Sequence, residues 1–391
     1  MRFPGFEGDW EVKKLGEIAK FSKGKGISKI DVVEDGATEC IRYGELYTHY
    51  GETVDEIKSK TNIDKSSLVL SEANDVIIPA SGETQIDIAT ASCVLKSGVA
   101  LGGDLNIIKT SNNGVFLSYY LNSSKKMEIA RLSQGISVVH LYSSQLALLN
   151  LKLPILSEQN KIATFLSLLN ERITTQKKII EELEKMKFSI AKKLFLQKLR
   201  YKDENGNEFP NWEVAKLKEI GIFFSGGTPL TSKKKYFNGD IPFIRSGEIN
   251  SAYTEQYIST EGLKNSSAKM IEVGDLIYAL YGATSGEVGI SQIKGAINQA
   301  ILCIRTNMNN IFLLNYLKIQ KENIIKTYLQ GGQGNLSAEI IKSLQIPVPF
   351  PEEQSKIAEL LLSLDEKINL ENDLLSQYEK QKKYLLTNLF I

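Results

Sequence analysis

The sequence predicts an α+β protein built as an internal tandem repeat, in which two similar mixed α/β domains are joined by two long antiparallel coiled-coil helices. Three observations predict this fold. A set of motifs occurs twice in the same order, each copy opens with short apolar runs between turn-forming residues, and each copy closes with apolar residues at heptad spacing. Each copy is therefore expected to contain a lobe followed by a rod.

The repeat is marked by pairs of matching motifs. The segment WEVKKLGEI begins at Trp10 and WEVAKLKEI begins at Trp212, an offset of 202 residues. Further pairs follow in the same order: CIRYGEL and FIRSGEI, NDVIIPASGET and GDLIYALYGAT, FLSYYL and FLLNYL, and LPILSEQNKIA and VPFPEEQSKIA. Two copies are too few for a solenoid, and each is long enough to fold alone. The pattern predicts two similar domains, at roughly 1–198 and 199–391.

The first part of each copy has the character of a mixed α/β lobe. Short apolar runs cover residues 76–79, 105–108, 276–280 and 301–304, and helical patches intervene at 115–132 and 311–329. Runs of this length bounded by Gly, Ser, Asn and Thr predict short strands.

A long helix is predicted after each lobe. Ser157 and Pro351 can open a helix because acidic residues follow in the first turn. Apolar residues then recur at alternating spacings of four and three, which is typical of a coiled-coil seam. The seam positions are Ile162, Leu166, Leu169, Ile173, Ile180 and Leu183 in the first copy and Ile357, Leu361, Leu364, Ile368, Leu375 and Tyr378 in the second. About 38–40 residues at ~1.5 Å each give a rod of roughly 55–60 Å.

The two helices are expected to pair with each other. Residues 153–209 carry a net charge of +3 and residues 347–391 carry −3. Opposite charge favours this pairing over the pairing of each helix with its twin in a second molecule. Polar residues at matching seam positions, Gln176 with Glu371 and Lys187 with Lys382, help to fix the register. The alternative is that each helix is merely amphipathic and covers the surface of a lobe.

These observations divide the chain into segments. They are a first lobe at 1–152, a first long helix at 153–198, a hinge at 199–209, a second lobe at 210–346 and a second long helix at 347–391. The hinge is expected from its polar run Asp-Glu-Asn-Gly-Asn.

Composition argues against several classes of protein. No stretch approaches 18 consecutive apolar residues, and the N-terminus shows no basic-then-apolar leader, so neither a membrane span nor secretion is expected. Cys40, Cys93 and Cys303 are odd in number and widely spaced, which is typical of reduced thiols in the cytoplasm. With only His49 and His140 in the chain, neither a metal site nor a catalytic triad is predicted. Because phosphate-binding and adenosylmethionine-binding glycine loops are also missing, no catalytic residue is expected.

The polar loops of the lobes are the candidate binding surface. Glycine lets the backbone approach a large partner closely, and Arg, Gln, Asn, Ser and Thr read base edges in the major groove of DNA. Lysines in corresponding early loops could hold phosphate. The candidate DNA-binding residues are Lys23, Lys25, Arg42, Tyr43, Ser81, Thr84, Gln134, Ser137 and His140 in the first lobe, and Thr228, Lys233, Lys234, Arg245, Ser246, Tyr281, Thr284, Gln330, Gln333 and Asn335 in the second.

Arg42 and Arg245 have an alternative role. They share the pattern Ile-Arg-x-Gly-Glu. A residue shared by two domains with different targets more often serves the fold or a phosphate contact than base reading. Loop residues that differ between the copies are better candidates for reading sequence, namely Ser81 against Tyr281 and His140 against Leu336.

Over essentially its whole length the chain resembles the specificity subunit of type I restriction-modification systems. The resemblance is carried by the two WEV openings, by SGGTP at Ser225, by GDIPFIRSGEI at Gly239, by INQA at Ile297, and by PxxxEQxKIA at Pro154 and Pro349, each followed by a heptad helix. The first lobe departs from this pattern, having Ser22-Lys23-Gly24-Lys25-Gly26 in place of SGGTP.

The resemblance implies a function. Each lobe is then a target recognition domain that reads one half of a bipartite site in double-stranded DNA. The helix pair sets the spacer between the half-sites and docks two methyltransferase subunits that use S-adenosylmethionine. Translocase-nuclease subunits that use ATP and Mg join this core. The chain itself is expected to hold no cofactor and no active site.

Residues 1–152 carry a net charge of −2 and residues 210–346 carry +3, so partner subunits are expected to supply most of the attraction to DNA. On the residues alone, two rival functions stay open: a coiled-coil adaptor with protein-binding lobes, and an enzyme with an unrecognised site. The loops are rich in Gly, Ser, Gln and Arg, whereas a protein-binding surface is expected to expose aromatic residues, so loop composition favours DNA binding over protein binding.

Overall fold

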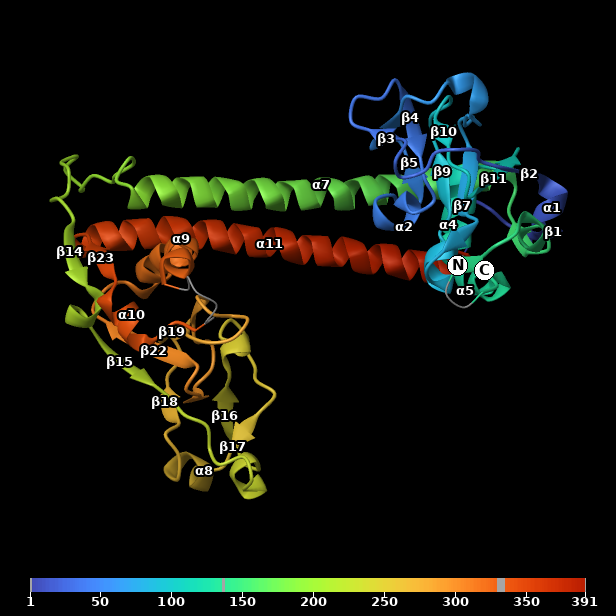
Figure 1. Cartoon of the computed structure of the whole chain (residues 1–391). Coiled ribbons are helices and arrows are strands. Elements are labelled where there is room, and N and C mark those ends of the chain that lie inside the picture. Colours follow the sequence, from blue (N-terminus) through green and yellow to red (C-terminus); the bar gives the residue numbers. More distant parts are fainter. Residues whose placement is uncertain (1, 136–137, 329–334, 391) are drawn as a thin grey trace. The chain divides into compact units, whose positions relative to one another are not determined.

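The computed structural model describes residues 2–135, 138–328 and 335–390 (Figure 1). It forms two compact units. Unit 1 comprises Met1–Lys177 with Asp373–Ile391, and unit 2 comprises Lys178–Asn372. Each unit holds one lobe, the start of the long helix that follows this lobe, and the end of the other long helix. Each long helix is thus divided between the two units, whereas the segments predicted from the sequence treat each helix as one piece.

The lobe of unit 1 is a mixed α/β fold. Its elements are β1 (Glu11–Lys14), α1 (Leu15–Ile18), β2 (Ala19–Lys23), β3 (Val32–Val33), β4 (Thr38–Ile41), α2 (Glu45–Thr48), β5 (Thr53–Val54), β6 (Ser59–Thr61), η1 (Lys65–Ser67), β7 (Asp75–Pro79), β8 (Ser81–Gly82), α3 (Gln85–Ile88), β9 (Ser92–Val94), β10 (Ala100–Leu101), β11 (Leu105–Thr110), α4 (Gly114–Asn122), α5 (Lys126–Leu132), β12 (Val139–His140), α6 (Ser143–Leu146) and β13 (Asn150–Leu153). One sheet has the order β2-β11-β7-β9-β5 and a second has β10-β4-β6-β3, while β1 pairs with β13 and β8 with β12.

The apolar runs found in the sequence form the interior strands of the larger sheet. Strand β7 is buried along its whole length, because it lies between β11 and β9 and pairs antiparallel with both. A strand covered on both faces needs apolar residues at successive positions, as in its Val-Ile-Ile run. Helix α4 packs in the same core, and its cap residue Asn113 accepts a hydrogen bond from the Phe116 backbone at 2.8 Å.

The lobe of unit 2 repeats this plan. Its elements are β14 (Glu213–Lys216), η2 (Leu217–Glu219), β15 (Gly221–Ser225), η3 (Lys234–Phe237), β16 (Ile241–Ile244), η4 (Ser246–Glu248), β17 (Tyr257–Ile258), α8 (Thr260–Lys264), β18 (Lys269–Ile271), β19 (Leu276–Ala279), β20 (Val288–Ile290), β21 (Gly295–Ile297), β22 (Ile301–Thr306), α9 (Asn310–Tyr328), α10 (Ala338–Ser343) and β23 (Gln345–Val348). The sheet β15-β22-β19-β20 matches β2-β11-β7-β9 of unit 1, and the β14–β23 pair matches β1–β13. The predicted fold class, with its two similar mixed α/β domains, is confirmed.

The two long helices are α7 (Leu156–Phe195, 40 residues) and α11 (Pro351–Leu389, 39 residues). Proline fits the first position of α11 because that position needs no backbone N–H donor. Within unit 1, the early part of α7 lies antiparallel to the end of α11. Lys177 pairs with Glu379 at 2.9 Å, and the Lys382 ammonium donates to Asn170 Oδ1 at 2.9 Å.

Unit 2 shows the reciprocal arrangement. The end of α7 packs against the start of α11, so that Leu194 shares a core with Ile357 and Leu361. Lys187 pairs with Asp365 at 2.5 Å, at the positions that correspond to Lys382 and Asn170 in unit 1. The two polar seam lysines thus make equivalent contacts, one in each unit.

The side chains that the heptad pattern selects face inward. Those that are buried are Ile162, Leu166, Leu169, Ile173, Ile180, Ile357, Leu361 and Ile368, and those that are half-buried are Leu183, Leu364, Leu375 and Tyr378.

Each lobe core is completed by the end of the long helix from the other copy. In unit 1, Phe390 stacks on Tyr120 with ring centroids 5.2 Å apart and meets Phe116 at 5.5 Å. In unit 2, the equivalent Phe195 meets Phe312 at 5.3 Å and Tyr316 at 5.4 Å. The core of each lobe therefore includes residues from more than one of the predicted segments.

Within the described parts of the chain, no helix combines the length and the apolar character needed to cross a lipid bilayer.

Candidate DNA interface

The lobe of unit 1 has a cleft of about 990 Å³ between three loops. These loops follow β2, β4 and β10. The cleft is lined by Gly26, Ile27, Ser28, Lys29, Asp31, Arg42, Tyr43, Gly44, Glu45, Tyr47, Thr48, His49, Glu83, Gly102, Gly103 and Asp104. Two of the predicted DNA-binding residues, Arg42 and Tyr43, lie here together, and the predicted Lys23 and Lys25 are exposed at the end of β2 and just after it.

Glycine allows the loops of this cleft to approach one another. A Cβ atom on Gly24 would lie 2.0 Å from the Gly102 carbonyl oxygen, so only glycine fits there. In unit 2, a Cβ on Gly226 would lie 1.7 Å from the Ile297 carbonyl oxygen. The glycines of the early loops thus serve close backbone packing in both units.

Arg42 is held by its own motif. Its guanidinium lies 3.2 Å from Glu45 Oε1, and its backbone N–H donates to Glu45 Oε2 at 2.9 Å. Glu45 is buried and also accepts from the Ser59 hydroxyl. The glutamate of the Ile-Arg-x-Gly-Glu pattern therefore binds both the backbone and the side chain of the arginine and holds the loop in this conformation.

Arg245 repeats this contact in unit 2 and adds another. Its guanidinium lies 2.8 Å from Glu248 and 3.0 Å from Glu255, and these carboxylates raise its pKa. The shared arginines thus have a structural role in the loop, in agreement with the alternative raised from the sequence. Their contact with DNA stays a prediction.

A second group of predicted residues meets on the small β8–β12 sheet of unit 1. Ser81 in β8 pairs with His140 in β12, and Gln134 exchanges backbone hydrogen bonds with His140 at 2.9 and 2.7 Å. Ser81 is buried while Gln134 and His140 are exposed. Thr84 has a local role, because its hydroxyl accepts from the Asp87 backbone and caps α3.

The sequence comparison paired His140 with Leu336, and this pairing is wrong by one residue. The Leu141 backbone donates to the Ala80 carbonyl at 3.0 Å, and the Leu336 backbone donates to the equivalent Leu280 carbonyl at 2.8 Å. The buried Leu141 and Leu336 are therefore counterparts, and the exposed His140 corresponds to the exposed Asn335. The error arose because an apolar core position was matched to a polar surface position.

The remaining predicted residues of unit 2 lie on several loops. The Thr228 hydroxyl hydrogen-bonds Gln299 at 2.7 Å, and the Lys233 ammonium lies 5.2 Å from the centre of the Tyr236 ring. Lys234 is exposed, and Ser246, Tyr281 and Thr284 are half-buried. Ser137, Gln330 and Gln333 lie outside the described residues.

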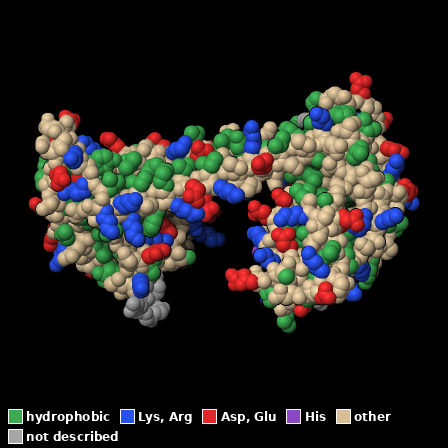
Figure 2. Space-filling model, turned by 90° about the horizontal axis from the view of Figure 1, so that it is seen from above, with side chains coloured by type: hydrophobic (Ala, Val, Ile, Leu, Met, Phe, Trp, Pro, Cys, Tyr) green, Lys and Arg blue, Asp and Glu red, His purple; other side chains and the backbone are tan. Residues whose placement is uncertain are grey.

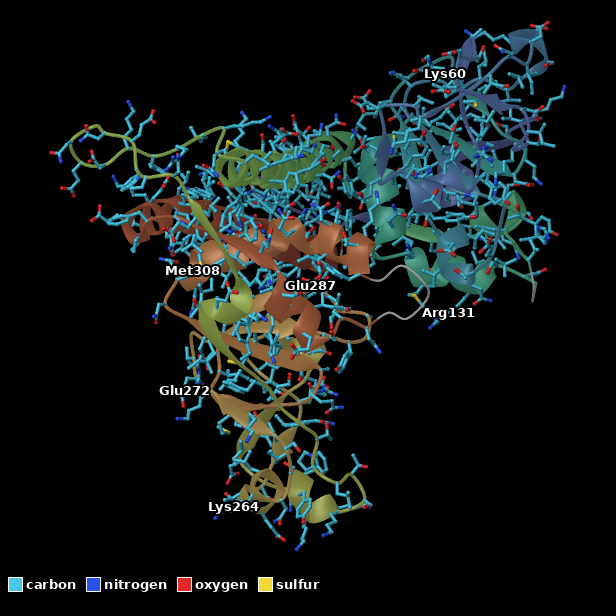
Figure 3. The ribbon with its side chains drawn as sticks, turned by 60° about the vertical axis from the view of Figure 1, so that its left-hand side comes forward. Lys60, Arg131, Lys264, Glu272, Glu287 and Met308 are labelled. Carbon is cyan, nitrogen blue, oxygen red and sulfur yellow. The ribbon has the colours of Figure 1, made fainter. Side chains whose placement is uncertain are left out.

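Sequence reasoning missed several exposed or half-buried residues that lie on the lobes. Tyr47 and His49 line the unit 1 cleft, but no counterpart in the second copy drew attention to them. Figure 3 shows further exposed cations, with Lys60 on β6, Arg131 at the end of α5 and Lys264 at the end of α8. On the face seen in Figure 2, basic and acidic side chains are intermixed on both units. This mixture agrees with the small net charges of the lobes.

Within residues 2–135, 138–328 and 335–390, no cluster of three or more His, Cys, Asp or Glu side chains could hold a metal ion.

The fold and these surfaces define a class of protein: a tandem-repeat chain that presents two similar lobes with different loops on paired helices. The sequence model of the family described as "Type I restriction modification DNA specificity domain" matches residues 7–185 and again residues 210–380. The chain belongs to this family, the type I restriction-modification specificity subunits, and carries two DNA specificity domains. The resemblance seen in the motifs is thus confirmed.

Similar proteins occur in archaea and bacteria. The chain is 28% identical to the putative type I restriction enzyme MjaX specificity subunit of Methanocaldococcus jannaschii, over 97% of this chain and 92% of that one. It is 22% identical to the EcoKI specificity subunit of Escherichia coli K12, over 89% and 80% of the two chains. The fold also matches the crystal structure of the type I S subunit from M. genitalium, with a TM-score of 0.66, 18% identity, and 98% and 96% of the two chains covered.

Proposed function

We propose that each lobe of this chain reads one half of a bipartite site in double-stranded DNA, and that the helix pair sets the spacer between the halves. The observation that carries this proposal is the relation between the lobes. Their main sheets share one strand order over four strands, but corresponding loops differ in sequence, as in SKGKG at 22–26 and SGGTP at 225–229. A common framework with different loops suits two readers of different sequences. This function requires access to DNA, which the cytoplasm provides.

We infer that the chain performs no chemistry itself. Burial raises the pKa of the Cys40 thiol to about 11 and the pKa of the Cys93 and Cys303 thiols to about 12. A thiol is a nucleophile only as the thiolate, so these groups are unreactive at neutral pH. The methyl transfer that uses S-adenosylmethionine, and the cleavage that uses ATP and Mg, then belong to methyltransferase and translocase-nuclease partners.

We propose that the long helices dock two methyltransferase subunits. In unit 1 a groove of about 590 Å³ runs along α7 and α11, lined by Phe165, Leu168, Leu169, Glu171, Arg172, Thr175, Gln176, Tyr378 and Gln381. Phe165 and Leu168 are exposed there. Exposed apolar side chains on a helix pair are typical of a surface that a partner helix covers.

The test is to co-express the chain with its cognate methyltransferase subunit and to map modified bases genome-wide by long-read sequencing. The expected result is one split motif with a fixed spacer that carries no sequence preference. If an active methyltransferase subunit forms a stable complex with the chain but modifies nothing, the lobes do not read DNA, and the protein-adaptor function is favoured.

A further inference from the structure

Each long helix begins with a buried glutamate that joins separate segments of its unit. In unit 2, the Glu353 carboxylate on α11 is 0% exposed. It accepts hydrogen bonds from Arg200 Nε at 3.1 Å, from Arg200 Nη2 at 2.8 Å and from Trp212 Nε1 at 2.8 Å. Arg200 comes from the segment that follows α7, and Trp212 directly precedes the first strand of the lobe. One carboxylate therefore ties the linker, the lobe and the helix together.

Arg200 extends this cluster to the backbone. Its Nη2 group donates to the carbonyl oxygens of Phe209 at 3.2 Å and Pro210 at 2.8 Å, which fixes the path of the chain into the lobe. Glu353 raises the pKa of Arg200, as expected for a closely bonded ion pair.

Unit 1 has the equivalent three residues, but they are joined by an ion pair alone. Glu158 is also 0% exposed, and Arg2 Nη2 lies 2.9 Å from its Oε2, but in the described part of the chain neither oxygen of this carboxylate accepts a hydrogen bond. Arg2 also donates to the Glu7 and Gly8 carbonyl oxygens, which correspond to those of Phe209 and Pro210. Among the described residues, however, Trp10 Nε1 has no hydrogen-bond partner. We call Arg200, Trp212 and Glu353 the unit 2 clamp, and Arg2, Trp10 and Glu158 the unit 1 clamp.

We propose that these clamps are positioning devices: each holds its lobe at one angle on the first turn of its long helix and so restricts the chain to one spacer length. This inference rests on the proposed function, in which the lobes read two half-sites at a fixed separation. Glu353, Arg200 and Trp212 are positioning residues in this scheme and need not touch DNA.

The chemistry of the clamp favours orientation over simple stability. A buried ion pair contributes little net stability compared with apolar residues of similar volume, because both charges lose their hydration. Its hydrogen bonds are directional, however, so they hold three segments at one geometry where apolar packing alone would allow sliding. The indole N–H of Trp212 and the Nε and Nη2 groups of Arg200 all donate to one carboxylate, which leaves few alternative arrangements. The unit 2 clamp, with more bonds, is the stricter of the two.

The experiment uses the chain in complex with its methyltransferase subunit. Methylation rates are measured on DNA with the native spacer and on DNA whose spacer is one base pair shorter or longer, with both half-sites kept. The substitution Glu353→Gln keeps the size of the side chain but removes its charge. We expect it to reduce the preference for the native spacer by about tenfold, since small losses of positioning have effects of this order or larger. Discrimination against single-base changes within each half-site should be unchanged.

Two further variants separate positioning from stability. Trp212→Phe removes the N–H donor, leaves a smaller aromatic ring in the core, and should relax spacer preference in the same direction. Ile304→Val, which shortens a buried side chain of the unit 2 core and leaves the three clamp residues intact, should lower the melting temperature without changing spacer preference. Glu158→Gln should have a smaller effect than Glu353→Gln.

The outcomes are distinct. If Glu353→Gln and Trp212→Phe retain the full preference for the native spacer, the clamp proposal is wrong while the proposed function stands. If the wild-type complex methylates DNA without any preference between spacers, the proposed function itself fails, and the clamp proposal fails with it.

Discussion

Glu248 shows how one residue of the repeated loop is held in its charged state. It accepts hydrogen bonds from the Arg245 side chain at 2.8 Å, from the Arg245 backbone at 3.0 Å and from the Thr254 hydroxyl at 3.1 Å. Burial alone would raise the pKa of Glu248, but these bonds outweigh it and lower the pKa to about 2. The loop is therefore stabilised by the ionised carboxylate.

This residue predicts a specific dependence of stability on pH. The folded pKa of Glu248 is lower than the ordinary value of 4.5. Its contribution is therefore fully present above about pH 4.5 and is lost as the pH falls toward about 2. This lowering of the pKa corresponds to a contribution on the order of 3 kcal/mol to the free energy of unfolding. Urea unfolding of wild type and Glu248→Gln at pH 7 and pH 3 should show the larger difference at pH 7. The same difference at both pH values would contradict this account.

The residue scale also shows where sequence reasoning stops. The glutamate partner of each shared arginine lies three residues further along the motif, so the loop contact could be inferred from the repeat. The second partner of Arg245 is Glu255, whereas the glutamate at the same offset in the first copy, Glu52, pairs with Lys382 instead. The clamp glutamates lie in the PxxxEQxKIA motifs that carried the family resemblance, but their buried contacts join distant segments, and Arg200 and Glu353 are 153 residues apart. No local pattern encodes such a contact.

At the scale of elements, the heptad spacing located both long helices and their inward faces, because a seam constrains every third or fourth residue. The ends of the helices are a different matter. Phe195 and Phe390 each complete the core of a lobe that belongs to the other copy of the repeat. The parallel pairings β4–β10 and β16–β21 are likewise non-local. Such contacts form only when the whole chain folds, and the spacing of apolar residues within one segment does not predict them.

The seam makes a prediction with a matched control. Leu169 is 6% exposed, whereas its neighbour Leu168 on the same helix is 55% exposed. Leu169→Lys should destabilise the helix pair of unit 1 by about 3 kcal/mol or more, because it removes a buried apolar side chain and introduces a charge. Leu168→Lys should change the free energy of unfolding by less than about 0.5 kcal/mol. Urea unfolding of both variants checks this, and equal stabilities would show that Leu169 does not lie in a packed seam.

Leu364→Lys is the corresponding change in unit 2. Leu364 is only half-buried, so Leu364→Lys should lower the free energy of unfolding by less than Leu169→Lys does. Both variants are also expected to weaken assembly with the methyltransferase subunit, measured by size-exclusion chromatography. An unchanged complex and an unchanged spacer in the modified motif would rule out the helix pair as the element that sets the spacer.

For the whole molecule, the division into two units predicts that DNA reading can be exchanged one half at a time. Replacing residues 1–152 with the equivalent lobe of a relative should change one half of the modified motif and leave the other half and the spacer unchanged. The exchange must preserve the contacts between the lobe and the long helices. Trp10, Phe116 and Tyr120 contact one another, and the last two contact Phe390.

The donor lobe should therefore supply aromatic residues at these three positions, and it should supply Arg2 for the ion pair with Glu158. A graft with these residues is expected to fold and to read a new half-site, mapped by long-read sequencing of modified bases. The same graft with Tyr120→Ala serves as the control. It should lose thermal stability, because the ring of Phe390 loses its stacking partner, but should keep the new half-site. A change in the half-site read by unit 2 would mean that the lobes do not recognise DNA independently.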